Sequence, residues 1–469
     1  MTARIIGLVV GATGFALACF APLPGGLARE GLVVAGLVWL MASWWMTEAI
    51  PLTATALTPF IVLPFAGVMD AGETASAYYS PILFLLLGGA FIALAIERTG
   101  LHRRLALAIL KAIGGRGGQA GLLLAFMVSA AILSMLISNT STALIMMPMA
   151  VAVLAGGGAK EGEFEGLSGA LPMGIAFAAS IGGLGTLVGS PTNAIAVGLL
   201  DTMIGTRISF AQWAFYGLPI VALGVPLAAL IIARVQQVAT HPFDVASAQE
   251  AIADETPMGV PEKRVMAIVA ITFLAWMTRL WLAPYLPEGS WTDGTIAIVA
   301  SLALFLLPDG TGRPLLVWSE ADRAPWGVIM MFGGGLALAA GMSASGLAEW
   351  LGNALLPLDA LPLVLIALAI VAMVVLITEF ASNVATATAI IPVVASLVVA
   401  LGADPVLLAM PAALAASWGF MLPAGTGPNA IAWSTGRIRI GRMVRAGLVL
   451  DLIGVGLIVA VVFGMRTLV

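Results

Sequence analysis

Long apolar segments alternate with short polar ones along the whole chain, a pattern typical of a protein that crosses a membrane many times. A helix needs about 20 apolar residues to cross a bilayer. Runs close to that length occupy residues 5–23, 31–49, 82–96, 210–233, 265–282, 295–307, 328–342 and 444–463. Further apolar segments are interrupted by Gly, Pro, Ser or Asn. Lipid cannot satisfy an open sheet edge. We therefore predict an all-α polytopic membrane protein with about eleven transmembrane helices and two shorter re-entrant hairpins.

Composition and charge agree with this class. Hydrophobic residues make up 61% of the 469 residues and charged ones 9%, against about 25% charged residues in a soluble domain. If the N-terminus is cytoplasmic, all Lys and Arg fall in cytoplasmic loops except Arg29, Arg207, Arg279 and Arg466. This positive-inside bias predicts a plasma (inner) membrane protein with a cytoplasmic N-terminus and an external C-terminus. A signal peptide after Arg4 is the less favoured alternative, because no clear small-residue cleavage site follows.

The chain contains an internal repeat. "SNTSTALIMMP" (138–148) matches "SNVATATAIIP" (382–392), and "LLGGAFIALAIERTGL" (86–101) matches "FGGGLALAAGMSASGL" (332–347). "GSPTN" (189–193) answers "GTGPN" (425–429), and "WMTE" (45–48) answers "WMTR" (276–279). The matches occur in the same order, which indicates duplication. An odd number of crossings in each half would turn the second copy upside down, as in the inverted repeats of secondary transporters.

The paired polar triplets that begin at Ser138 and Ser382 predict binding chemistry. A helix broken inside the membrane leaves backbone groups unpaired, which is costly unless something polar meets them. The N-terminus of the half-helix that follows suits carboxylate oxygens, and the carbonyls that precede it suit a small hard cation. The amide of Asn139 or Asn383 can serve both ligands. A cap at a surface turn would explain one such triplet. Two copies in apolar surroundings favour a site for a cation beside an anion.

Other chemistries find little support in the sequence. The single cysteine, Cys19, excludes an intrachain disulfide and a cysteine-based metal site, and His102 and His241 are too few for a histidine centre. Catalytic motifs are missing, so we predict a protein that is not an enzyme. Glu48 and Glu379 lie close to or within apolar segments. Such acids are candidates for proton or ion coupling, with helix-end capping or hydrogen bonding to a broken segment as the alternative.

Five stretches resemble the divalent anion/sodium symporter (DASS) family, which includes the INDY-type dicarboxylate and citrate carriers. They are "WWMTEAIPLTATALTP" (44–59), "GGAFIALAIERTGLHRRLAL" (88–107), "SMLISNTSTALIMMP" (134–148), "TEFASNVATATAIIP" (378–392) and "FMLPAGTGPNAI" (420–431). The resemblance covers nearly the whole chain. It implies eleven transmembrane helices with two re-entrant hairpins, a homodimer, and an elevator movement of a transport domain against a scaffold.

With this family as a guide, we divide the chain into five segments. The scaffold would comprise residues 1–112 with the first four transmembrane helices and residues 265–355 with the seventh to ninth. The transport domain would comprise residues 113–240, with the first hairpin and helices five and six, and residues 356–469, with the second hairpin and helices ten and eleven. Residues 241–264 would form a cytoplasmic linker.

The resemblance also implies which residues bind ligands. The sodium ligands would be Ser134, Ser138, Asn139 and Gly189 in the first half and Thr378, Ala381, Asn383 and Gly425 in the second, with Ala381 and Gly425 acting through their carbonyls. The substrate would be bound by Ser138, Asn139, Thr140, Ser382, Asn383, Val384 and Thr426. The chain departs from the family at Val384, where the triplet normally ends in Thr, and at Gly427, which replaces a proline.

These observations predict a secondary active transporter that couples sodium to uptake of a small dianion, most simply a C4-dicarboxylate such as succinate, malate or fumarate. Neither triplet nor either break contains Lys or Arg, so the dianion would carry uncompensated charge into the membrane unless cations travel with it. At least two sodium ions per dianion follow from this argument. Alternatives of the same fold are a dicarboxylate exchanger and a carrier of citrate, sulfate or another oxyanion. We expect no cofactor and no nucleic-acid partner.

Overall fold

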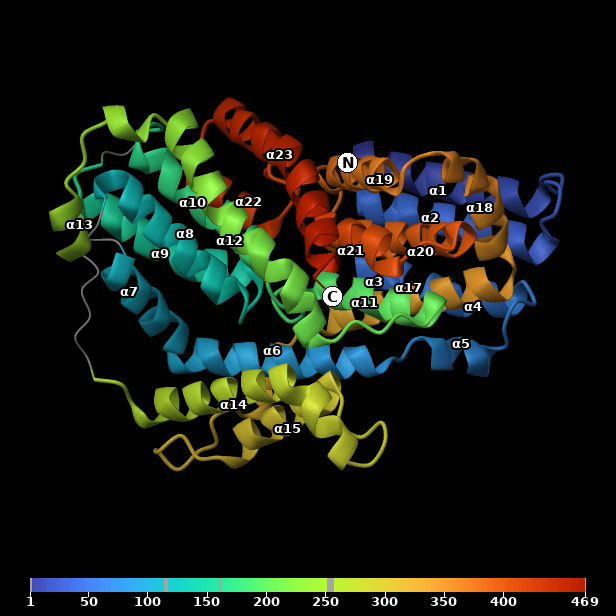
Figure 1. The fold of residues 1–469 in the computed structure, drawn as a ribbon, viewed down its shortest axis with the longest axis horizontal. Helices are drawn as coiled ribbons and strands as arrows, with labels where there is room; N and C mark the ends of the chain where they lie inside the picture. The colour runs from blue at the N-terminus through green and yellow to red at the C-terminus, as the bar shows by residue number, and fades with distance from the viewer. Residues whose placement is uncertain (1, 114–116, 160–161, 251–256, 469) are drawn as a thin grey trace.

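The computed structural model describes residues 2–113, 117–159, 162–250 and 257–468. Two cations of the predicted cytoplasmic loops, Arg116 and Lys160, lie outside the described residues, as do part of the predicted linker (251–256) and the two terminal residues. Within the described ranges the chain folds into α-helices and short 3-10 turns without a β-strand (Figure 1).

The helices of the N-terminal part are α1 (Thr2–Phe20), α2 (Arg29–Thr47), α3 (Leu52–Thr55), α4 (Thr58–Phe65), α5 (Ala71–Ala77), α6 (Pro81–Thr99), α7 (Leu101–Ile113), α8 (Gly118–Ser134), α9 (Asn139–Gly156), α10 (Leu167–Gly183), α11 (Pro191–Ile204), α12 (Phe210–Val235) and α13 (Val245–Glu250). Those of the C-terminal part are α14 (Val260–Leu282), α15 (Asp293–Leu306), α16 (Trp318–Ala321), α17 (Trp326–Ala344), α18 (Leu347–Leu355), α19 (Leu363–Thr378), α20 (Asn383–Leu401), α21 (Pro405–Ala415), α22 (Gly427–Ser434) and α23 (Ile440–Arg466).

The predicted all-helical class is confirmed. Each of the uninterrupted apolar runs found in the sequence forms a helix, namely α1, α2, α6, α12, α14, α15, α17 and α23. In the described part of the chain, nine helices are long and apolar enough to cross a membrane, and shorter apolar segments of 10–17 residues accompany them. The finer count of about eleven crossings stays a prediction.

Local sequence explains where the helices begin and end. The Ser209 hydroxyl caps α12 by accepting a hydrogen bond from the Gln212 N–H, and the Gln212 side-chain oxygen accepts one from the Ser209 N–H, which completes a capping box. Pro81 and Pro191 occupy the first positions of α6 and α11, where a missing N–H costs nothing. Gly100 ends α6 with φ of 77°, a left-handed conformation that suits glycine.

Two sets of seven helices follow one another in matching order, α6–α12 and α17–α23. In each set a long apolar helix leads into an amphipathic one (α7 or α18), and a pair separated by a polar break follows (α8 and α9, or α19 and α20). The packing between the sets is reciprocal, because α9 contacts α22 while α20 contacts α11, and α12 contacts α23. Such reciprocity is what a two-fold relation between the halves produces.

Helix α10 lies at the centre of the first set, and every one of its residues is buried. A Cβ atom at Gly182 would lie 2.3 Å from the carbonyl oxygen of Ala131. Only glycine allows α10 and α8 to approach this closely, so the polar break after α8 is held against the end of α10. Helices α14 and α15 pack beside α6 along one edge of the molecule (Figure 1), away from these breaks.

Candidate functional site

The first break in the helices lies between α8 and α9. Ser138 is extended (φ −64°, ψ 152°), caps α9 by accepting a hydrogen bond from the Ser141 N–H at 3.1 Å, and donates to the Ser141 hydroxyl at 3.0 Å. Asn139 is the first helical residue after this cap. The chain therefore stops, turns and restarts within residues 135–138, as the polar triplet predicts.

Oxygen atoms converge behind this break. One end of the Asn139 amide lies 2.7 Å from Ser134 Oγ, 3.1 Å from the Gly189 carbonyl and 3.3 Å from the Ala179 carbonyl. Ser134 Oγ also donates to Ala179 at 2.6 Å, and Ser134 is fully buried. With its nitrogen at this end, the amide has three oxygens within reach of its two hydrogens. With its oxygen at this end, four oxygens face one another and the Ser134 hydroxyl supplies the one hydrogen among them, an arrangement that suits a small cation.

The second break, between α19 and α20, repeats this geometry. Ser382 has nearly the same conformation as Ser138 (φ −65°, ψ 145°) and accepts from the Ala385 N–H at 3.3 Å. The buried Thr378 hydroxyl lies 2.9 Å from Asn383 Oδ1 and 2.8 Å from the Ala416 carbonyl. Its single hydrogen can serve only one of these two oxygens. At this second break too, more oxygen atoms lie close together than the available hydrogen atoms can bridge.

A second pair of breaks, before α11 and α22, supports the first pair. Asn193 donates to the carbonyls of Gly183 (2.7 Å) and Thr186 (2.8 Å), and Asn429 donates to the carbonyl of Leu422 at 3.1 Å. Both asparagine side chains are buried. These amides hold the irregular backbone that presents Gly189 in one half and Gly425 in the other.

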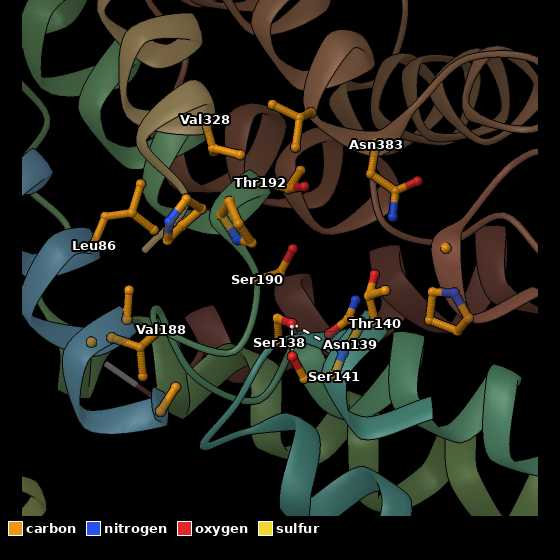
Figure 2. A pocket seen from close by; sticks show the side chains of 18 of the residues that line it. Leu86, Ser138, Asn139, Thr140, Ser141, Val188, Ser190, Thr192, Val328 and Asn383 are labelled. Carbon is orange, nitrogen blue, oxygen red and sulfur yellow. Dashed lines mark hydrogen bonds between the residues drawn. The ribbon is translucent and has the colours of Figure 1, made fainter. Parts of the chain in front are cut away.

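The four breaks surround one cavity of about 420 Å³. Figure 2 looks into it, with Ser138, Asn139, Thr140 and Ser141 on one side and Thr192 and Asn383 across from them. The wall also includes residues of α6 such as Leu86, the loop residue Arg323, and the residues that open α11, α20 and α22. The N-terminal ends of α9, α11, α20 and α22 therefore meet at this cavity, and the partial positive charge of helix N-termini favours an anion there.

The structure brings the predicted residues together. All the predicted substrate residues line the cavity, namely Ser138, Asn139, Thr140, Ser382, Asn383, Val384 and Thr426, and Gly425 joins them. Of the other predicted sodium ligands, Ser134, Thr378 and Ala381 are buried beside the breaks, and the Gly189 carbonyl faces Asn139. The positions are thus those of a single site, and the ligand roles themselves stay predictions.

Sequence reasoning missed five polar residues of the cavity wall, namely Glu97, Ser141, Ser190, Thr192 and Arg323. Ser190 occupies the place in the first half that Thr426 occupies in the second, so the alignment of "GSPTN" with "GTGPN" could have found it. Arg323 and Glu97 come from a loop and from the end of α6, and no motif marks either of them. Arg323 places a cation on the cavity wall although the triplets and breaks contain none.

The two acids singled out in the sequence have different surroundings. Glu48 ends α2 in a left-handed conformation with φ of 46°. Glu379 is fully buried, and its carboxylate accepts hydrogen bonds from the N–H groups of Met421 (2.9 Å) and Leu422 (3.0 Å) in the break before α22. Hydrogen bonding to a broken segment, one of the two readings of Glu379, is therefore observed.

Gly427, one of the two departures from the family pattern, has a steric explanation. A Cβ atom at this position would lie 2.5 Å from Thr140 Oγ1. The equivalent residue of the first half is Pro191, and the counterpart of Thr140 is Val384. At these two positions the first half therefore has Thr140 and Pro191, and the second half has Val384 and Gly427. This difference makes the cavity asymmetric.

Comparison with known proteins gives a family and relatives that match nearly the whole chain. A family described as "Sodium:sulfate symporter transmembrane region" matches residues 2–468. A sodium-dependent dicarboxylate transporter, SdcS, of Staphylococcus saprophyticus is 38% identical over 478 residues, covering 98% of this chain and 91% of the relative. SdcS of Staphylococcus aureus strain MRSA252 is also 38% identical, with the same coverage.

Two solved structures share the fold at low sequence identity. The YdaH transporter of Alcanivorax borkumensis has a TM-score of 0.58 and 16% identity, covering 99% of this chain and 97% of that one. MtrF of Neisseria gonorrhoeae, from a class of antimetabolite efflux pumps, has a TM-score of 0.56 and 13% identity, covering 98% and 94%. Family and relatives are transporters, in agreement with the prediction of a carrier and not an enzyme.

Proposed function

Because this chain belongs to the sodium:sulfate symporter family, as the sequence resemblance predicted, we propose that it couples the inward movement of sodium to the uptake of a C4-dicarboxylate such as succinate, malate or fumarate. One observation carries the proposal. Four helix N-termini meet at a single cavity, and a cluster of oxygens lies behind each of two of them. The cavity suits an anion and the oxygen clusters suit small cations.

The first cation would lie among Ser134 Oγ, the Asn139 amide oxygen and the Gly189 carbonyl, since these atoms already face one another. The second would lie among Thr378 Oγ1, Asn383 Oδ1 and the carbonyls of Ala381 and Gly425. Sodium takes oxygen ligands of this kind, as hard cations do. The sodium ions are cargo, and each would turn the amide oxygen of its asparagine toward itself and the NH₂ toward the cavity.

The dicarboxylate would bind between the two triplets. One carboxylate would be held by Ser138, Asn139 and Thr140, and the other by Ser382, Asn383 and Thr426, all on the wall of the cavity. Arg323 offsets part of the dianion's charge, but Glu97 on the same wall opposes it. Since these two charges cancel, cations must still accompany the substrate, and at least two sodium ions would neutralise a dianion.

The sequence relatives support this substrate and this cation, because two proteins at 38% identity carry the name sodium-dependent dicarboxylate transporter. Uptake of labelled succinate into proteoliposomes, with a sodium, potassium or pH gradient imposed in turn, tests the proposal. We expect accumulation only with sodium. Sodium-independent exchange against internal dicarboxylate would instead indicate an exchanger. Uptake of labelled sulfate or citrate but not of labelled succinate would indicate another anion.

The movement proposed for the carrier is an elevator. Residues 113–240 and 356–469 would form the transport domain, and residues 1–112 and 265–355 the scaffold, joined by the linker 241–264. The packing supports this division, because α8–α12 contact α19–α23 extensively, while α6, α14 and α15 contact one another. We also propose a homodimer in the plasma membrane, with a cytoplasmic N-terminus and an external C-terminus.

Alternating access can be tested with one introduced cysteine. The chain has a single cysteine, Cys19, so Cys19→Ser leaves a background without thiols. A cysteine at Thr140 should then be modified by a membrane-impermeant thiol reagent from one side only, and the accessible side should change when sodium and succinate are added. Accessibility that ligands never alter would exclude movement of this site.

A further inference from the structure

The cavity has charged residues at one end. Among the described residues that line it, the charged ones are Glu97 and Arg323. Glu97 lies near the end of α6, and Arg323 lies in the loop before α17. Arg323 lines the cavity, whereas its neighbour Asp322 is exposed and is not part of the wall. The loop therefore forms a rim between the cavity and the surface, and we call this end of the cavity its mouth.

An apolar wall separates the mouth from the breaks. A Cβ on Gly89 would lie 2.8 Å from Val188 Cγ1, so α6 meets the first break at Gly89. Glu97 lies about 12 Å farther along α6, since a helix rises about 1.5 Å per residue. Between these two levels the residues of α6 that line the cavity are Ala90, Ala93 and Leu94. Each polar residue of the described wall therefore belongs either to the breaks or to the mouth.

The guanidinium of Arg323 is available for a ligand. Among the described residues it donates one hydrogen bond, from Nε to the Glu320 carbonyl at 3.4 Å, and it forms no ion pair, not even with Glu97. The carboxylate of Glu320 is already bound by Arg98 at 3.3 Å and by Arg313 at 2.8 Å. The planar fork of donors on an arginine suits a carboxylate.

The proposed binding of the substrate at the breaks makes no use of this arginine. There, both carboxylates are held by the two triplets and Thr426. An extended C4-dicarboxylate measures about 6 Å between its outermost oxygens, because its bonds are about 1.5 Å or shorter. It is too short to cover the distance of about 12 Å from the first break to the level of Glu97. Arg323 can therefore meet a carboxylate only while the substrate is outside the triplets.

The charges of the mouth are not repeated in the other half. Ser343 corresponds to Glu97 in the aligned repeat, and in the same register Ala77 corresponds to Arg323. A mouth on the opposite face, built from these positions, would carry neither charge. Under the orientation proposed above, the loop of Arg323 faces the cytoplasm, which is the side where the dicarboxylate is released.

We propose that Arg323 and Glu97 form an outer binding site for the dicarboxylate at the mouth of the cavity. The guanidinium of Arg323 binds one carboxylate, and the negative charge of Glu97 keeps this binding weak, so that the substrate moves on to the breaks or to water. Because the outer site lies on the path to the breaks and is not part of the final site, it speeds entry and exit by the same factor. The inference rests on the proposed function, since the proposed dicarboxylate is its ligand.

The rates of succinate binding to the purified full-length protein test the proposal. Stopped-flow tryptophan fluorescence in excess sodium gives the association and dissociation rate constants, since Trp326 lies close to Arg323 in the sequence, and labelled succinate gives the equilibrium Kd. We expect Arg323→Gln to lower both rate constants about tenfold, as loss of electrostatic steering does. Kd should change by less than about twofold, because a screened charge at this distance from the breaks acts weakly.

Two further measurements use the sign of the charge. Glu97→Gln should raise both rate constants, the opposite of the effect of Arg323→Gln, because it removes a repelling charge. Choline chloride added at constant sodium should slow association in the wild type and much less in Arg323→Gln. Arg103→Gln is the matched control, because it removes an exposed arginine of α7 that does not line the cavity, and it should keep the rates of the wild type.

Chemical modification separates the charge of Arg323 from its packing. In the Cys19→Ser background, Arg323→Cys should bind succinate as slowly as Arg323→Gln does. Aminoethyl methanethiosulfonate adds a cation to the introduced thiol and should restore most of the association rate. The sulfonatoethyl reagent adds an anion and should slow association further.

Three results would overturn the outer site: a Kd that rises in Arg323→Gln while association stays unchanged, rates that stay unchanged in both variants, or an introduced thiol that neither reagent modifies. The first would make Arg323 a ligand of the final site, and the other two would remove it from the path. Wild-type protein that binds no succinate in the presence of sodium contradicts the proposed function as well, so the two failures are distinguishable.

Discussion

The two halves of the molecule build the same break, but the side chain that holds it donates a hydrogen bond in the first half and accepts hydrogen bonds in the second. In the first half, the Thr186 side chain, in the break before α11, donates to the Met135 carbonyl at 2.7 Å at the end of α8. In the second half, the Glu379 side chain, at the end of α19, accepts N–H groups of the break before α22. The backbone geometry is shared, including the caps at Ser138 and Ser382, whereas the side chains that hold it are not.

This difference indicates how a duplicated chain can bind unlike ligands. The parts that both halves share, caps and amide oxygens, are those that a cation and a carboxylate need in either half. The parts that differ, Thr140 against Val384 and Met135 against Glu379, surround these shared groups. Under the proposed function, the shared groups give binding and the unlike groups give selectivity.

The largest expected effect comes from the shared amides. Asn139→Ala and Asn383→Ala should each lower sodium-driven succinate uptake in proteoliposomes at least about 100-fold, because each removes a proposed ligand of both cation and anion and leaves buried oxygens without a partner. Asn353→Ala, on the amphipathic helix α18, is a control of the same chemistry outside the site and should transport normally.

Equal losses in the two asparagine variants would support equivalent cation sites. Near-normal uptake with unchanged sodium affinity in either variant would remove that residue from the site. Each variant is first shown to elute as the wild type does in size-exclusion chromatography, so that loss of uptake reports on binding and not on folding.

An exchange of side chains between the halves should have a smaller effect. A hydrogen bond to a charged group contributes about 1.5 to 3 kcal/mol. Val384→Thr should therefore tighten succinate binding about tenfold, and Thr140→Val should weaken it by a similar factor. The measurement is competition of succinate, malate, fumarate, citrate and sulfate against labelled succinate. If both variants show the inhibition profile of the wild type, neither position contacts the substrate.

Much of this site was predictable because a break in a membrane helix is visible in the sequence as polar residues within an apolar run. A polar triplet inside an apolar run, repeated in order with a downstream Gly and Asn, leaves few structures that satisfy the backbone. The alignment placed Asn139 and Asn383 at equivalent positions, and the structure gives both the same cap and a Ser or Thr neighbour at hydrogen-bonding distance. The all-helical class followed from the same hydrophobic pattern.

Other features depend on contacts between distant segments and left no pattern in the sequence. The carboxylate of Glu379 accepts the N–H groups of Met421 and Leu422 only because the break before α22 lies against the end of α19. Arg323 reaches the cavity because the loop before α17 lies at its wall. A single acid or arginine has no periodicity or spacing, so only the fold shows its partner.

A several-fold effect is expected from the steric difference at Gly427. The methyl group added by Gly427→Ala would lie 2.5 Å from Thr140 Oγ1, so the Thr140 side chain must rotate away from the substrate. We expect succinate affinity to fall several-fold. In a Thr140→Ala background the same change should cost little, because contacting residues are not additive. Gly441→Ala, where no atom lies within 4 Å of the new methyl group, is the control. Additive losses in the double variant would contradict the contact.

The smallest effect is expected at the ends of α6 and α17, where the halves differ outside the four breaks. Arg98, near the end of α6, pairs with Asp309 at 2.7 Å and with Glu320 at 3.3 Å, whereas the aligned residue of the second half is Ala344. Hydrogen bonds from Thr311 and the guanidinium of Arg98 hold the pKa of Asp309 well below its usual value. A lowered pKa in the folded state means that ionised Asp309 contributes stability above about pH 4, and that this contribution is lost as the pH falls toward the folded-state pKa.

Asp309→Asn should therefore lower Tm by a few degrees at pH 7, and the difference from the wild type should shrink as the pH falls below about 4. Differential scanning fluorimetry of the purified protein at several pH values measures this. Asp359→Asn, at an exposed aspartate, should leave Tm unchanged. Sodium affinity should also stay unchanged in Asp309→Asn, because the ion pairs of Arg98 fix the end of α6 and lie outside the four breaks. A change in sodium affinity as large as that expected at the breaks would mean that the end of α6 is coupled to the cation sites. In that case α6 would belong to the unlike surroundings that act on the shared binding groups.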